Sequence, residues 1–167
     1  MTLKSSIPSL NSKVQGWLTL LGRLVLGGVL ITAGYLKAKN PTEATASVRV
    51  YKLLPVSVAN IFGYALPWIE IGVALLLIVG IWVRQSSILA GGLMVLFIFA
   101  VGQAWARKLA INCGCFGNGG LSADGKVHAG VYLTEILRDI GLTIVAGYLY
   151  RFPQGKFGVD KASTELE

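Results

Sequence analysis

The chain has 167 residues, of which 54% are hydrophobic and 14% charged, with a formal net charge of +7. Soluble domains average about 45–50% apolar and about 25% charged residues, so this composition favours a membrane protein over a soluble domain. The basic residues stand singly between apolar segments, which argues against a nucleic-acid partner and fits lysines and arginines at lipid headgroups.

The polar residues 1–16 precede the first apolar segment. That segment is too long for the core of a secretory signal peptide, and no small-residue cleavage site follows it. We therefore expect it to stay in the mature protein as a membrane anchor. The chain then divides into a polar N-terminal tail (1–16), a membrane domain (17–150) and a polar C-terminal tail (151–167).

Four apolar segments predict membrane-spanning helices. Each approaches the roughly 20 residues that cross about 30 Å of hydrocarbon at about 1.5 Å per residue. Unpaired backbone groups are not tolerated in lipid, so helices are the expected form, and the glycines within them favour close packing. The segments are 17–36, 62–83, 86–106 and 130–150. We expect an all-α fold, a four-helix transmembrane bundle.

A short amphipathic helix is predicted between the first and second segments. Asn40 fits its N-cap, Pro41 its first turn and Glu43 the third helical position. Apolar residues then recur at helical spacing as far as Pro55. This pattern is typical of a helix that lies on a membrane surface, and an irregular loop is the alternative. Lysines and arginines are almost equally numerous on the two sides, so the positive-inside rule does not orient the chain.

Five charged residues fall inside the predicted spans: Arg23, Glu70, Glu135, Arg138 and Asp139. A lone charge there costs roughly 2.5–3.5 kcal/mol, so we expect these side chains to face the bundle and to pair. Arg138 lies three residues from Glu135, which permits a pair on one helix. Arg23 and Glu70 would pair if their helices are antiparallel neighbours. The five either stabilise helix packing or form a polar pocket for a quinone headgroup or a proton route.

Both cysteines of the chain, Cys113 and Cys115, lie between the third and fourth segments. A disulfide across one residue closes a very small ring, whose strain makes it reducible, and Gly114 would relieve part of that strain. So small a loop adds little stability, so a bond here would serve redox chemistry better than structure. Two thiolates would also give half of a tetrahedral metal site or a Cu(I) site, and inert buried cysteines are the third alternative.

The sequence resembles a known family in two places. The residues Arg23, Gly27, Gly34, Lys37, Glu70, Gly72 and Gly80 resemble the first half of the DoxX-like four-helix membrane proteins. The run Cys113-Gly114-Cys115-Phe116-Gly117, with Arg138-Asp139 in the last segment, resembles the MauE branch of that group. The likeness covers about residues 17 to 150.

The resemblance implies a redox-associated protein of the bacterial inner membrane that forms or transfers disulfides outside the cytoplasm beside a thioredoxin-like partner. The MauE branch is named for a protein needed in methylamine dehydrogenase maturation. Cytoplasmic termini and an extracytoplasmic cysteine segment are implied as well. Four-helix thiol oxidases that pass electrons to quinone carry a second cysteine pair, whereas this chain has two cysteines in all. A partner protein would therefore supply the other dithiol.

We accordingly predict a membrane thiol–disulfide oxidoreductase or disulfide carrier. Cys113 and Cys115 would exchange with a thioredoxin-like protein and pass electrons toward quinone, with no metal cofactor. One alternative is a non-enzymatic assembly factor or subunit for a partner redox enzyme. The other is a carrier of copper or another metal.

Overall fold

The computed structural model describes residues 12–109, 111–112, 120–121 and 129–153. The described chain forms five helices and one pair of two-residue strands. They are α1 (Ser12–Lys39), α2 (Pro41–Val50), α3 (Val56–Val79), α4 (Val83–Ala106), β1 (Ile111–Asn112), β2 (Gly120–Leu121) and α5 (Ala129–Arg151). Within this part of the chain, three helices are long and apolar enough to cross a membrane, namely α1, α3 and α4.

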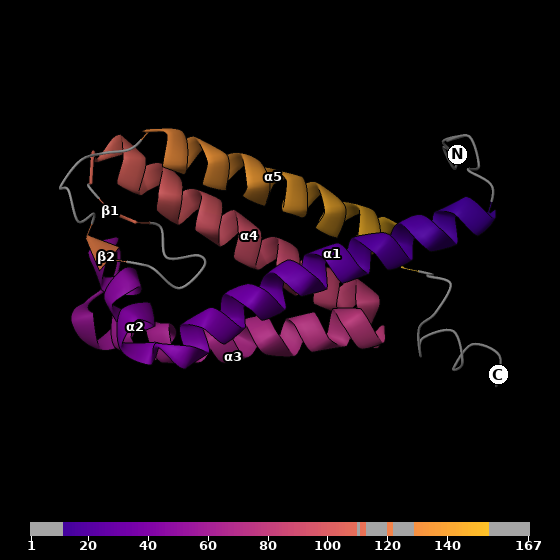
Figure 1. Cartoon of the computed structure of the whole chain (residues 1–167), viewed down its shortest axis with the longest axis horizontal. Helices are drawn as coiled ribbons and strands as arrows, with labels where there is room; N and C mark the ends of the chain where they lie inside the picture. Colours follow the sequence, from indigo (N-terminus) through magenta and orange to yellow (C-terminus); the bar gives the residue numbers. More distant parts are fainter. Residues whose placement is uncertain (1–11, 110, 113–119, 122–128, 154–167) are drawn as a thin grey trace, which may run out of the picture.

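The four long helices form two packed pairs, α1 with α3 and α4 with α5 (Figure 1). One apolar core joins the two pairs, and every long helix contributes to it. Its buried residues are Leu26, Leu30, Val73, Ala74, Leu77, Ala90, Met94, Leu142, Ala146 and Leu149. An all-α fold is therefore observed. The sequence also predicts that the fourth long helix, α5, spans the bilayer. Its charged residues Glu135, Arg138, Asp139 and Arg151 lower its hydropathy, and its span stays a prediction.

Glycines permit the close approach of α1 to α3. A Cβ added at Gly34 would lie 2.9 Å from the carbonyl oxygen of Pro67, and one at Gly27 would lie 3.3 Å from that of Ala74. Gly27 lies beside Ala74 and Gly34 beside Pro67, so the order of the contacts is reversed along α3 and the two helices run antiparallel. Such small-residue contacts are how helices approach each other closely in a bilayer.

The predicted second segment, 62–83, is wrong at both ends. Helix α3 begins earlier, at Val56, and ends at Val79, where Gly80 takes a left-handed φ of 80°. Trp82 has a φ of 50°, and α4 then begins at Val83, three residues before the predicted start. The apolar run continues across this turn, so hydropathy alone does not reveal it.

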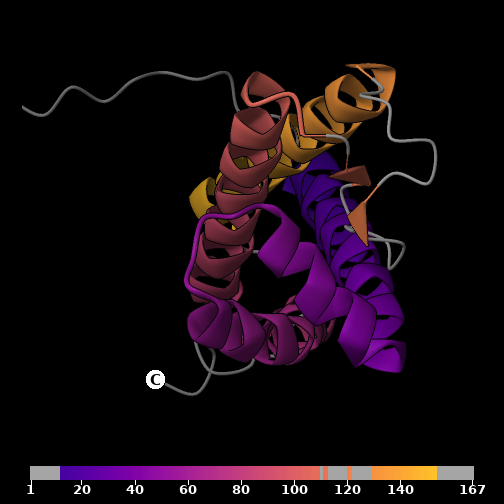
Figure 2. The same cartoon turned by 90° about the vertical axis from the view of Figure 1, so that its left-hand side faces the viewer.

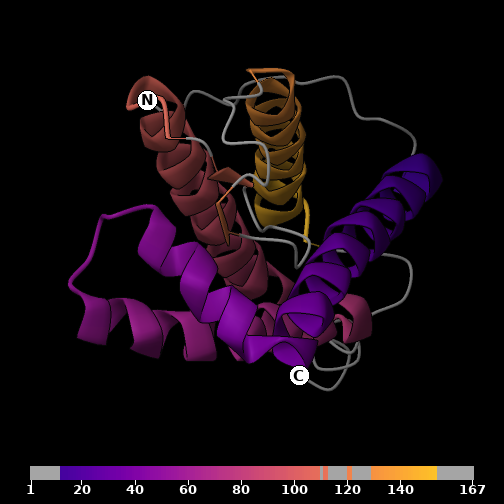
Figure 3. The same ribbon diagram turned by 60° about the vertical axis from the view of Figure 1, so that its left-hand side comes forward.

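The predicted short helix is present as α2. Asn40 holds its N-cap position, but no side-chain capping hydrogen bond is made there. Helix α2 lies across the first half of α3, where Thr45 fills the space beside Gly63. Figures 2 and 3 show α2 running from the end of α1 towards α4. Its location at the bilayer surface stays a prediction.

Candidate functional site

A buried ion pair joins α1 to α3 at the end of the bundle nearest α2. Lys37 Nζ lies 2.5 Å from Glu70 Oε1, and the two residues are 6% and 0% exposed. The ammonium also lies 4.9 Å from the centre of the Phe97 ring on α4. Sequence reasoning missed this pair because Lys37 comes just after the predicted span 17–36. The family resemblance, which includes Lys37, was the one signal pointing to it.

A second polar group lies on α5. Arg138 donates to Asp139 Oδ1 from Nε at 2.9 Å and from Nη2 at 2.7 Å. Its Nη2 also lies 2.5 Å from Glu135 Oε2, which is the pair predicted from the three-residue spacing. Asp139 is 1% exposed, so the arginine compensates a carboxylate that has almost no contact with the exterior.

The two groups meet at Lys37. A cavity of about 10 Å³ is lined by Lys37, Phe97, Arg138 and Asp139 together with apolar residues of α1 and α4. Its volume is close to that of a single water position. Two basic and three acidic side chains therefore share one region, a formal excess of one negative charge. Within the described chain, Glu70 Oε2 and Asp139 Oδ2 are buried and accept no hydrogen bond.

Arg23 does not pair with Glu70, which corrects the sequence prediction. Its Nε donates to the carbonyl oxygen of Leu77 at 2.8 Å and its Nη2 to that of Ile78 at 3.0 Å. These carbonyls lie at the C-terminal end of α3, where no further helical turn supplies backbone N–H groups to bond them. Leu77 is seven residues beyond Glu70, or about 10 Å along the helix. Arg23 therefore caps α3 at the opposite end from the polar groups.

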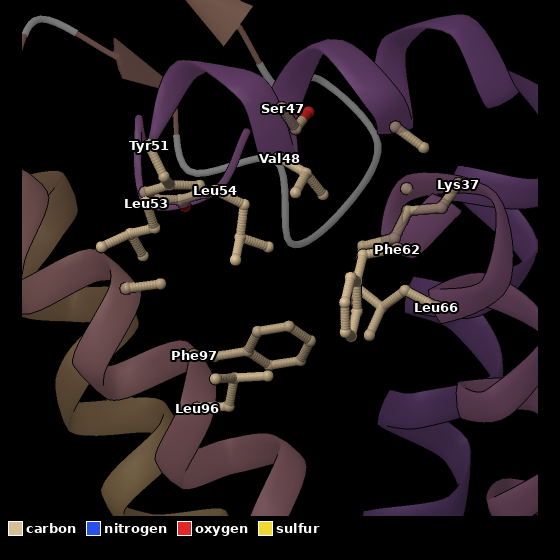
Figure 4. A pocket seen from close by; sticks show the side chains of 13 residues that line it. Lys37, Ser47, Val48, Tyr51, Leu53, Leu54, Phe62, Leu66, Leu96 and Phe97 are labelled. Atoms are coloured by element: carbon tan, nitrogen blue, oxygen red, sulfur yellow. The ribbon is translucent and has the colours of Figure 1, made fainter. Parts of the chain in front are cut away.

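An apolar pocket adjoins Lys37 beneath α2 (Figure 4). Its volume is about 260 Å³. It is lined by Lys37, by Ala44, Ser47 and Val48 of α2, by Tyr51, Leu53 and Leu54, by Phe62, Gly63 and Leu66 of α3, and by Leu96, Phe97 and Ala100 of α4. Lys37 is the charged member of this lining. None of the five charged residues predicted inside the spans lines this pocket. Glu70 is connected to it by its ion pair with Lys37, which does line the pocket.

The predicted dithiol, Cys113 and Cys115, lies outside the described residues. The strands that precede and follow residues 113–119 are described, and they pair antiparallel with Ile111 opposite Leu121. Strand β2 lies against α2, the helix that covers the pocket (Figure 1). On the preceding side, the Tyr132 hydroxyl of α5 donates to the carbonyl oxygen of Leu109 at 2.6 Å. The chain on both sides of the cysteine segment is thus tied to the pocket end of the bundle.

The family model and the curated proteins that this chain resembles carry the same family name. The family model for methylamine utilisation protein MauE matches residues 15–152. The methylamine utilization protein MauE of Methylorubrum extorquens is 37% identical over 113 residues, which cover 67% of this chain and 56% of that protein. The protein of the same name from Methylophilus methylotrophus is 35% identical over 88 residues, covering 52% of this chain and 46% of its own length.

The chain thus spans about half the length of these curated relatives. No solved structure matches it. The matched range contains the positions of the buried ion pair, the α5 polar group and the two cysteines. Together with the three membrane-capable helices, it identifies an integral membrane protein. The chain belongs to the MauE family.

Proposed function

We propose that this protein is a membrane accessory factor that supports maturation of an extracytoplasmic redox enzyme by thiol–disulfide exchange at Cys113 and Cys115. The observation that carries the proposal is the position of the only two cysteines of the chain, with one residue between them, inside the family-matched range. Because the relatives are named for methylamine utilisation, the enzyme served is methylamine dehydrogenase or a similar one. The termini are cytoplasmic and the cysteine segment extracytoplasmic, where disulfides persist.

The exchange balances in two steps. In the first, a thiolate of a thioredoxin-like partner attacks the Cys113–Cys115 disulfide, and the partner's second thiolate then resolves the mixed disulfide. The partner leaves oxidised, and the chain holds two thiols. In the second step, the dithiol forms its disulfide again and releases two electrons and two protons. A quinone-class acceptor of the membrane takes up both and becomes a hydroquinone.

The test uses the full chain in membranes of producing cells. Alkylation with a thiol-reactive mass tag after acid quenching should show a fraction of molecules with Cys113 and Cys115 oxidised. A reduced thioredoxin-like protein added to the purified chain should become oxidised in equal amount. Cys113→Ser and Cys115→Ser should each abolish this transfer, and one of them should accumulate a mixed disulfide. Asn118→Ser, a change in the same segment that leaves both thiols, should transfer like the parent chain.

Two results in producing cells would overturn the proposal. One is a chain whose cysteines are always reduced in cells. The other is a doubly substituted Cys113→Ser/Cys115→Ser chain that supports accumulation of the partner enzyme as well as the parent does. That second result would identify a non-enzymatic assembly factor. Stoichiometric metal on the purified chain, lost on substitution of the cysteines, would identify a metal carrier instead.

A further inference from the structure

We propose that the apolar pocket beneath α2 is the binding site of the quinone-class electron acceptor, with Lys37 Nζ donating a hydrogen bond to one ring carbonyl oxygen. This inference rests on the proposed function, because it names the site at which the dithiol's electrons leave the chain. Four properties of the described residues support it: the opening of the pocket, its lining, its charge and its position.

The pocket opens onto the apolar exterior of the bundle. Four of its lining residues, Leu53, Leu54, Phe62 and Leu96, are between 41% and 48% exposed. In a bilayer, side chains of this kind face lipid rather than water. A ligand would therefore enter from the membrane, which selects a molecule with an apolar tail that is already dissolved there.

The lining selects a ring with few polar atoms. Apart from Lys37, side chains able to form hydrogen bonds come only from Ser47 and Tyr51, and the Ser47 hydroxyl already donates to the carbonyl oxygen of Glu43 at 2.7 Å. An ammonium carries three N–H donors, and Glu70 accepts one of those of Lys37 at 2.5 Å. Phe62, Phe97 and Tyr51 offer aromatic surface to a planar ring. The volume of about 260 Å³ lies just below the usual range for ligand pockets, which suits a single ring better than a larger cofactor.

The charge of the region disfavours a phospholipid. Lys37 is already paired with Glu70, and three carboxylates outnumber two cations around it. An anionic phosphate placed beside Lys37 would meet this excess negative charge at low dielectric, where repulsion is strong. A neutral carbonyl oxygen avoids that cost. The two protons that quinone reduction needs are those that the dithiol releases, and buried carboxylates beside the ring can accept them and pass them on.

The position links the pocket to the predicted dithiol. Helix α2 supplies one wall of the pocket, and β2, which directly follows residues 113–119, lies against that helix. At the other side, Gln103 Nε2 of α4 donates to the carbonyl oxygen of Tyr51 at 2.9 Å and so fixes the segment that follows α2. The wall of the pocket and the chain beside the cysteines are thus parts of one packed unit.

The test is photolabelling of the purified full-length chain, in bilayer discs of phosphatidylcholine, with an azido derivative of short-tailed ubiquinone. Labelled peptides should include residues of the pocket lining. Lys37→Met should weaken binding about tenfold or more, as expected when a charged donor is lost. Lys39→Met, which removes an exposed lysine from the same helix turn, should bind within twofold of the parent chain.

Because Lys37→Met leaves Glu70 buried and unpaired, two further variants keep the test decisive. Lys37→Met/Glu70→Gln removes both charges and should bind as weakly as Lys37→Met. Ala100→Phe keeps the ion pair and fills the pocket from α4, so it should also abolish specific labelling. In both variants, Cys113 and Cys115 should still oxidise a reduced thioredoxin-like protein after treatment with diamide, but should no longer be reoxidised by the ubiquinone.

Several outcomes would overturn the inference. One is labelling that maps elsewhere, and another is binding that Lys37→Met/Glu70→Gln and Ala100→Phe leave unchanged. Displacement of the probe by phosphatidylglycerol in the discs would make the occupant a lipid. These outcomes do not affect the proposed exchange at the cysteines. Conversely, exchange that persists in Cys113→Ser would overturn the proposed function, and unchanged quinone binding in that variant would leave the binding site itself standing.

Discussion

The guanidinium of Arg23 occupies the space that a side chain at Gly80 would need. A Cβ built on Gly80 falls within contact distance of Nη1, Nη2 and the central guanidinium carbon of Arg23. Gly80 also has a φ of 80°, a conformation that other residues rarely adopt. The cap on α3 therefore depends on both residues, one supplying the donors and the other leaving room for them.

Gly80→Ala should lower stability by about 1–2 kcal/mol from the left-handed backbone alone, and by more if Arg23 is displaced from its two carbonyls. Thermal unfolding in detergent measures the effect. Gly92→Ala is the control, because a Cβ at that position on α4 meets no atom within 4 Å. Equal melting temperatures for the two variants would contradict the role of Gly80.

Gly63→Ala should separate α2 from α3. The new Cβ would lie 2.6 Å from the backbone Cα of Thr45, which cannot move without shifting α2, and overpacking of this kind costs typically about 1–3 kcal/mol. Gly72→Ala on the same helix meets no atom within 4 Å and should be neutral or slightly stabilising. Because α2 covers the pocket, only Gly63→Ala should also weaken quinone binding. Equal affinity in both variants would argue that α2 does not shape the pocket.

Arg138→Met should destabilise the chain, because it leaves Asp139 buried without its cation. Breaking a fully buried ion pair costs about 3–5 kcal/mol. We expect a smaller loss here, because the side chain of Arg138 is partly exposed. The double variant Arg138→Met/Asp139→Asn removes both charges and should recover part of the loss. A double-mutant cycle on the unfolding free energy gives the coupling. Additive single effects would show that the two side chains do not stabilise each other.

Tyr132→Phe removes the hydroxyl that donates to the carbonyl oxygen of Leu109 and keeps the ring, which stacks on Trp105 with centroids 6.3 Å apart. A net loss of about 0.5–1.5 kcal/mol is expected. The chain just before β1 should become less protected, which hydrogen exchange at residues 109–112 measures. Unchanged exchange there would show that the hydroxyl does not anchor this segment.

The helices were predictable because their signals are local. Span length, the apolar runs and the Asn40-Pro41 start predict five helices, and five helices are present in the described chain. The turn at Gly80 was not predictable from hydropathy, since Ile81, Trp82 and Val83 extend the apolar run across it. A glycine in the left-handed conformation does not change the hydropathy of the segment, so the hydropathy pattern does not reveal the turn.

The ion pairs were only partly predictable. The Glu135–Arg138 pair follows from spacing within one helix, which sequence fixes. The partner of Glu70 depends on the register of α1 against α3, which glycine contacts such as that of Gly34 with Pro67 decide. That register brings Lys37, rather than Arg23, opposite Glu70.

The pocket could not be predicted from the sequence either, because its walls come from four separate parts of the chain.

The antiparallel contacts of α1 with α3 also bear on how the protein enters the membrane. Helix α1 carries Arg23 and Lys37, and both bind groups of α3 that are synthesised some 30 residues or more later. Each would cost roughly 2.5–3.5 kcal/mol as an isolated charge in lipid. Partitioning of α1 is therefore less favourable by itself than together with α3. The insertion machinery should retain α1 until α3 emerges and release the two as a helical hairpin, with α2 folded between them.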